Sequence, residues 1–196
     1  MLPHKLDTVS RTPEYSAQPM TLRFLPRIIA AALTLIAAVA VGTFGASGKP
    51  KWVTYRSPTA FYSVVHPSDW RVKRDDGEKN ILHIIPDDQG SGVTISAYIG
   101  KPPPALSPEK LISGAFPTQQ PTSPLLTVTG SGWKGMRRTF LDKALTPQRE
   151  WEIIVATSTD GMVIITSNEA SPRMAERAPV YTRIMQSLKL STPKLP

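Results

Sequence analysis

Glu150-Trp-Glu-Ile-Ile-Val-Ala-Thr157 and Met162-Val-Ile-Ile-Thr166 are two β-prone runs joined by a short polar segment that contains Asp160-Gly161. Asp-Gly between two apolar runs is a strong hairpin signal. The first run is apolar on both faces, with Trp151, Ile153 and Val155 on one and Ile154 and Ala156 on the other. Because a sheet that is apolar on both faces must be covered on both, the hairpin predicts an α+β fold in which helices sandwich a central antiparallel sheet.

Further strand and helix signals lie on both sides of this hairpin. The expected strands are β-prone runs bounded by turn residues, and they cover 52–55, 61–65, 70–72, 81–85, 93–99, 125–129 and 133–141. Ser107-Pro108 predicts a capped short helix that ends near Phe116. At the end of the chain, Pro172 predicts a helical turn, and Pro179 predicts the start of a separate final helix.

Residues 28–46 form an apolar segment of nineteen positions without a charged residue, Asn, Gln or His, and Arg23 and Arg27 precede it. A helix of about 20 apolar residues spans the hydrocarbon core of a bilayer. The segment therefore predicts a hydrophobic helix that crosses the cytoplasmic membrane once. The expected organisation is a cytoplasmic tail (1–27), an anchor (28–46), a linker (47–50), one domain facing the periplasm or exterior (51–190) and a C-terminal tail (191–196).

A signal peptide is the alternative interpretation of the same segment. Translation from Met20 would give a short basic region that ends at Arg27, followed by the apolar run and by small residues suited to cleavage, for instance after Gly48. The mature domain would then be a soluble periplasmic or secreted protein. The length of the apolar run favours the retained anchor, because a signal peptide usually has about 7–15 apolar residues.

Charge and cysteine content exclude several classes of function. The chain has 23 Lys and Arg against 15 Asp and Glu, a formal net charge of +8, and no cysteine. Disulfides, thiolate nucleophiles and cysteine metal sites are therefore impossible. The positive charge is spread along the chain, whereas a nucleic-acid-binding protein would cluster it on one face. Anionic lipid head groups, cell-wall polymers or an acidic protein are the partners that this mild bias suits.

Two motifs resemble a known family. Trp52-x-x-Tyr55 followed by Phe61-Tyr-Ser-Val-Val-His-Pro-Ser-Asp-Trp-Arg-Val72 is similar to the opening of PsbP-like domains, and Tyr181-x-x-Ile-Met-x-Ser-Leu-Lys189 resembles their last helix. The superfamily includes DcrB-like and LpqN-like bacterial envelope proteins. The resemblance implies an antiparallel sheet between helices. It also implies a role in binding or assembly support, and not in catalysis. It transfers no functional residue to this chain.

Candidate metal and catalytic residues have simpler structural interpretations. His66, Asp69 and His83 include metal-ligand types, but His66 occupies a position that is aromatic in the PsbP-like pattern, and His83 lies inside an apolar strand. The acidic turns at 75–78 and 87–88 lack the spacing of a calcium loop. Ser-x-x-Lys occurs without the motifs that accompany it in serine enzymes. We therefore expect no metal, no cofactor and no catalytic residue, and we expect Trp70 to be a core anchor.

One strand combines basic and apolar side chains on a single face. Lys134, Met136, Arg138 and Phe140 alternate along the expected strand at 133–141 and so project from the same side. This face could contact a lipid head group or an acidic partner. The alternative is an ordinary solvated strand, in which the long basic side chains cover apolar surface.

Together these features predict a non-catalytic, membrane-tethered accessory or binding module of the bacterial cell envelope. Its expected partners are the membrane itself, through residues 28–46, and an unidentified protein or lipid, but no nucleic acid. The alternative function is that of a cleaved, soluble periplasmic or secreted protein that binds a small apolar or lipidic ligand.

Overall fold

The computed structural model describes residues 50–75, 80–86, 91–102 and 106–194. The apolar segment at 28–46 and most residues of the two acidic turns lie outside these ranges. Within them, no helix has both the length and the hydropathy needed for crossing a membrane.

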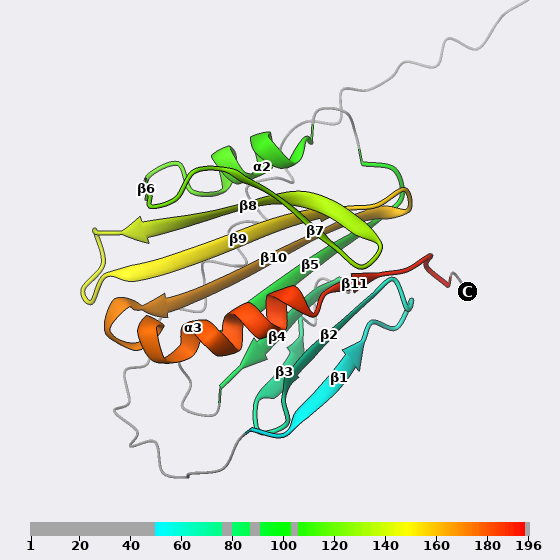
Figure 1. Ribbon diagram of the computed structural model, residues 1–196, viewed down its shortest axis with the longest axis horizontal. Helices are drawn as coiled ribbons and strands as arrows, with labels where there is room; N and C mark the ends of the chain where they lie inside the picture. The colour runs from blue at the N-terminus through cyan, green and yellow to red at the C-terminus, as the bar shows by residue number, and fades with distance from the viewer. Residues whose placement is uncertain (1–49, 76–79, 87–90, 103–105, 195–196) are drawn as a thin grey trace, which may run out of the picture.

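Eleven strands and two helices make up the described fold (Figure 1). They are β1 (Trp52–Arg56), β2 (Tyr62–Pro67), β3 (Arg71–Arg74), β4 (Ile81–Ile85), β5 (Val93–Ile99), α2 (Pro108–Ala115), β6 (Gln120–Pro121), β7 (Leu126–Gly130), β8 (Trp133–Asp142), β9 (Arg149–Thr157), β10 (Gly161–Ala170), α3 (Ser171–Gln186) and β11 (Lys189–Leu190). An eight-stranded sheet has the order β3-β4-β5-β10-β9-β8-β6, with β7 also paired to β8, and a smaller sheet has the order β1-β2-β11.

The predicted hairpin is confirmed and lies at the centre of the large sheet. Strands β9 and β10 pair antiparallel from Thr157 opposite Met162 to Arg149 opposite Ala170. Alternate residues of β9 enter two different cores. Ile154 and Ala156 belong to the first core, on the α3 side, and Trp151, Ile153 and Val155 belong to the second core, on the α2 side.

Each face of the sheet has a helical cover, as the apolar hairpin predicts. Helix α2 begins after Ser107, whose Oγ accepts a hydrogen bond from the Lys110 amide at 3.4 Å, and it packs Leu111 and Ile112 into the second core. Helix α3 runs across the opposite face (Figure 1), and it packs Tyr181 and Ile184 into the first core. The α+β fold with a mostly antiparallel sheet between helices is thus confirmed for the described residues.

Two details differ from the sequence-based expectation. The end of the chain forms one helix, with Pro179 inside it, where two separate helical segments are expected. A proline removes one hydrogen bond from a helix interior, and burial of an apolar helix face can outweigh that loss. In addition, β1 and β2 join β11 in a separate small sheet, which covers part of the first core beside α3.

A buried ion pair connects α3 to the end of β10. The Arg177 guanidinium lies 3.0 Å from Glu169 Oε2, and the two side chains are 4% and 2% exposed. The Tyr181 hydroxyl donates to the same carboxylate oxygen at 3.0 Å. Trp70 packs edge-on against the Tyr181 ring with centroids 5.8 Å apart, which is the anchoring contact expected of it. Polar and aromatic contacts therefore fix α3 on the sheet.

Candidate functional site

A pocket of about 500 Å³ lies between the small sheet and the edge of the large one. The β1–β2 hairpin forms one wall, and the ends of β3, β4 and β5 form the other. Volumes of about 300–1,000 Å³ are typical of small-molecule sites. The pocket is therefore large enough for a small ligand, and its walls come from two different sheets.

The hairpin wall is held by a network of backbone hydrogen bonds. Ser57 and Tyr62 close the turn, with Ser57 N donating to Tyr62 O at 2.9 Å and Tyr62 N donating to Ser57 Oγ at 3.1 Å. Ala60 in this turn has a φ of 55°, which is unusual for a residue other than glycine. The C-terminal tail binds the same turn, because Lys194 N donates to Thr59 O at 2.7 Å. Hydrogen bonds within the turn and from the C-terminal tail therefore hold this wall in place.

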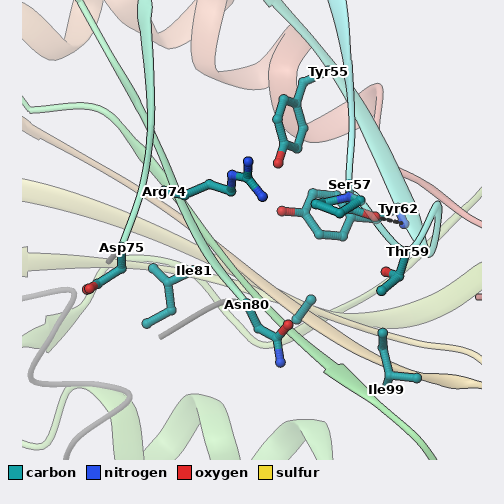
Figure 2. A pocket seen from close by; sticks show the side chains of 11 residues that line it. Tyr55, Ser57, Thr59, Tyr62, Arg74, Asp75, Asn80, Ile81 and Ile99 are labelled. Carbon is teal, nitrogen blue, oxygen red and sulfur yellow. Dashed lines mark hydrogen bonds between the residues drawn. The ribbon is translucent and has the colours of Figure 1, made fainter. Parts of the chain in front are cut away.

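Two tyrosines and an arginine lie close together in the polar part of the pocket. Figure 2 shows the hydroxyl groups of Tyr55 on β1 and Tyr62 on β2 directed toward the guanidinium of Arg74 on β3. The two rings are 6.1 Å apart. Burial and then the neighbouring Tyr55 raise the pKa of Tyr62 well above its ordinary value of 10.0, while the charge of Arg74 lowers it. Tyr62 therefore keeps its hydroxyl proton under physiological conditions.

Apolar side chains complete the lining. Ile81 begins β4 and is buried, and Ala97 and Ile99 project from β5. Ala97 N donates to Asn80 O at 3.0 Å, which fixes the start of β4 against β5 at this place. Ser57, Thr59, Asp75 and Asn80 also line the pocket. The pocket therefore combines charged and hydroxyl groups with an apolar surface, a composition suited to recognition of an amphiphilic molecule.

Ser57, His66 and His83 each have a hydrogen-bond partner in the structure. Ser57 Oγ accepts a hydrogen bond from the Tyr62 backbone amide. His66 Nδ1 lies 2.8 Å from Pro67 O, and His83 Nδ1 lies 3.1 Å from Thr94 Oγ1. In the part of the chain that the structure describes, no three His, Asp or Glu side chains gather closely enough to hold a metal ion.

His83 provides a test based on pH. Burial, with a smaller contribution from Lys73, lowers the pKa of His83 below its ordinary value of 6.5, against an opposing effect of Asp75. Between the lowered folded pKa and the unfolded pKa, the unfolded chain binds more protons, so stability falls as the pH falls. We expect urea denaturation to show a larger loss of stability from about pH 7.5 to about pH 5 for the natural chain than for His83→Asn. Equal losses would contradict the burial of a neutral His83.

The four residues predicted on the strand at 133–141 do lie on one face of β8, which is the face toward α2. Phe140 is buried in the second core, and Met136 packs against that core. Arg138 lies over the Phe140 ring at 5.7 Å, and its Nε donates to Ser123 O at 3.2 Å. Lys134 is exposed. The structure thus places three of the four against protein, and partner binding at this face stays a prediction.

Tyr55 and Tyr62 belong to the motif at 52–72, but neither they nor Arg74 were predicted from sequence as site residues. Because side chains alternate between the two faces of a strand, the sequence could have shown which face each of these residues occupies. No local pattern could have shown that strands of two separate sheets face each other across a pocket. The residues come together only when the small sheet packs on the large one.

Comparisons with known proteins support the fold. No family model matches the chain, and no curated protein matches its sequence. The solved structure of cyanobacterial PsbP (CyanoP) from Synechocystis sp. PCC 6803 matches with a TM-score of 0.55 and 9% identity, over 77% of this chain and 99% of that one. The Ran-binding protein Mog1p of Saccharomyces cerevisiae matches with a TM-score of 0.51 and 8% identity, over 74% and 97% of the two chains.

LpqN, involved in cell envelope biogenesis of Mycobacterium tuberculosis, is also similar, with a TM-score of 0.48 and 12% identity over 74% of this chain and 92% of that one. At such low identities, the likeness to PsbP and Mog1p establishes the fold alone. It confirms the PsbP-like architecture that the motifs at 52–72 and 181–189 predicted.

Proposed function

From its PsbP-like fold and the pocket between its sheets, we propose that this protein is a non-catalytic binding module of the bacterial cell envelope. In this proposal residues 28–46 hold it on the outer side of the cytoplasmic membrane as an accessory to a protein or lipid partner. The observation that carries the binding role is the pocket lined by Arg74, Tyr55 and Tyr62. These groups recognise a ligand by charge and hydrogen bonds, and they include no paired nucleophile and base.

A second candidate is a soluble protein that binds a small apolar or lipidic ligand after its leader is removed. The small residues Gly45-Ala46-Ser47-Gly48 after the apolar run favour this form, because they suit cleavage. The apolar side chains of Ile81 and Ile99 in the pocket suit its ligand. Both candidates place the same binding domain outside the cytoplasmic membrane.

The location can be tested by fractionation of cells that produce the full chain with a C-terminal tag. We expect the tag in the membrane fraction, resistant to carbonate extraction and accessible to protease in spheroplasts, with an N-terminus that precedes residue 28. A mature N-terminus near Lys49 in a soluble fraction would select the cleaved form. A tag that is protected from protease in spheroplasts would contradict both.

Binding can be tested by placing a photo-reactive amino acid at Thr59, on the rim of the pocket, and at Thr127, an exposed residue of β7. Illumination of intact cells should give a discrete protein or lipid adduct at position 59 and none at position 127. Adducts of equal yield and identity at both positions, or none at position 59, would remove the support for a binding module.

A further inference from the structure

We infer that the pocket binds an organic oxyanion, a carboxylate or a phosphate monoester, that carries a short apolar body. The inference rests on the proposed binding role and names the class of ligand. The Arg74 guanidinium and the two tyrosine hydroxyls would hold the oxyanion, and Ile81, Ala97 and Ile99 would contact the apolar body.

Arg74 provides the positive charge. Its guanidinium lies on the pocket side of β3 (Figure 2), and no carboxylate of the described residues forms an ion pair with it. The neighbouring Asp75 also lines the pocket, but Figure 2 shows its carboxylate turned away from the guanidinium. A planar guanidinium matches the two oxygens of a carboxylate or phosphate.

The tyrosines add donors beside this charge. Tyr62 is 4% exposed, and its side chain forms a hydrogen bond with that of Tyr55. Because burial keeps Tyr62 protonated, its hydroxyl remains a donor. An anionic oxygen placed between Arg74 and the tyrosine hydroxyls would receive charge-assisted hydrogen bonds from both kinds of group.

The rest of the pocket selects against a bare inorganic anion. Ile81 is buried at the start of β4, and Ala97 and Ile99 lie along β5. A volume of about 500 Å³ exceeds what a phosphate ion needs. An apolar body bound there would remove water from these side chains, with a gain of about 25 cal/mol per Å² of apolar surface buried.

The strand that carries Arg74 also offers a matched control. Arg71, Lys73 and Arg74 give β3 three basic residues at the edge of the large sheet, where basic side chains commonly prevent pairing with another chain. Lys73 pairs with His83 and Arg74 pairs with Leu82, so the two neighbours project from opposite faces. Lys73 and Arg74 are both exposed, but of the two only Arg74 lines the pocket.

The experiment uses the full chain in phosphatidylcholine nanodiscs, with isotope-labelled isoleucine methyl groups. Hexanoate or hexyl phosphate should shift the methyl signals of Ile81 and Ile99 in a saturable way. The neutral hexanamide and inorganic phosphate should bind at least about tenfold more weakly than hexanoate. Hexanamide lacks the negative charge, and inorganic phosphate lacks the apolar body. Arg74→Gln should weaken hexanoate binding by about tenfold or more, Tyr55→Phe should weaken it less, and Lys73→Gln should leave it unchanged.

Three results would overturn the inference. The first is equal binding of hexanoate and hexanamide, and the second is an equal effect of Arg74→Gln and Lys73→Gln. Absence of any methyl shift would also overturn it, whereas an adduct at position 59 would still support the binding module. Nanodiscs that contain phosphatidic acid, a lipid phosphate monoester, identify the source of the anion. If hexanoate no longer binds in these nanodiscs, the lipid head group occupies the pocket and is the source of the anion. If hexanoate binds as before, the natural ligand is a soluble anion. Both outcomes support the ligand class.

Discussion

Glu169→Gln is expected to lower the free energy of unfolding by about 3–5 kcal/mol, the usual cost of breaking a buried ion pair. The substitution keeps the shape of the side chain but removes the negative charge that lies 3.0 Å from the buried Arg177 guanidinium. It also weakens the hydrogen bond that the Tyr181 hydroxyl donates to the same oxygen. Urea denaturation monitored by tryptophan fluorescence measures the change.

Glu176→Gln is the matched control, because Glu176 precedes Arg177 on α3 and is exposed. It makes the same change of charge and should alter stability by no more than about 0.5 kcal/mol. Tyr181→Phe should have an intermediate effect of about 1.5–3 kcal/mol, the value of a hydrogen bond to a charged group. Equal effects of the two glutamate substitutions would show that the Glu169–Arg177 pair contributes nothing specific.

Phe140→Ala is expected to cost about 3–5 kcal/mol, as truncation of a core aromatic residue usually does. The Phe140 ring is 3% exposed, and its centroid lies 4.8 Å from that of Phe116, which follows α2. The Phe116 ring in turn lies 5.3 Å from Trp151. Removal of Phe140 therefore opens a cavity in the second core, and we expect α2 to become the least protected element in hydrogen exchange.

Lys134→Ala on the same face of β8 serves as the comparison. Lys134 is exposed, and its truncation should change stability by no more than about 0.5 kcal/mol. Phe140→Ala and Lys134→Ala together distinguish a partner-binding face on β8 from a face that packs in the core. If Phe140→Ala leaves stability unchanged and removes a partner adduct, the aromatic ring belongs to a binding surface. A loss of stability with Phe140→Ala alone assigns it to the core.

The central hairpin could be predicted from sequence because its information is local. The Asp160-Gly161 turn and the alternation of Trp151, Ile153 and Val155 with Ile154 and Ala156 are properties of neighbouring residues. Burial on both sides of β9 follows from that pattern. The start of α2 at Pro108 was predictable for the same reason, since a cap and a first-turn proline act within one turn of helix.

Long-range contacts decided the features that were not predicted. Strand β11 has two residues, too few for a periodic signal, and it forms because Leu190 and Lys189 reach Tyr62 and Ser63 of β2. Pro179 is a local helix breaker, yet α3 continues through it on the surface of the first core. In both cases the packing energy of distant segments outweighs the local preference.

The sequence by itself determined the fold class, the two-sided burial of the central hairpin and the presence of an apolar segment suited to a membrane. Only the tertiary structure placed Tyr55, Tyr62 and Arg74 around one pocket. Periodicity states which face of a strand a residue occupies, because the period is a property of the backbone. It does not state which face of another sheet lies opposite, because that depends on how the two sheets pack.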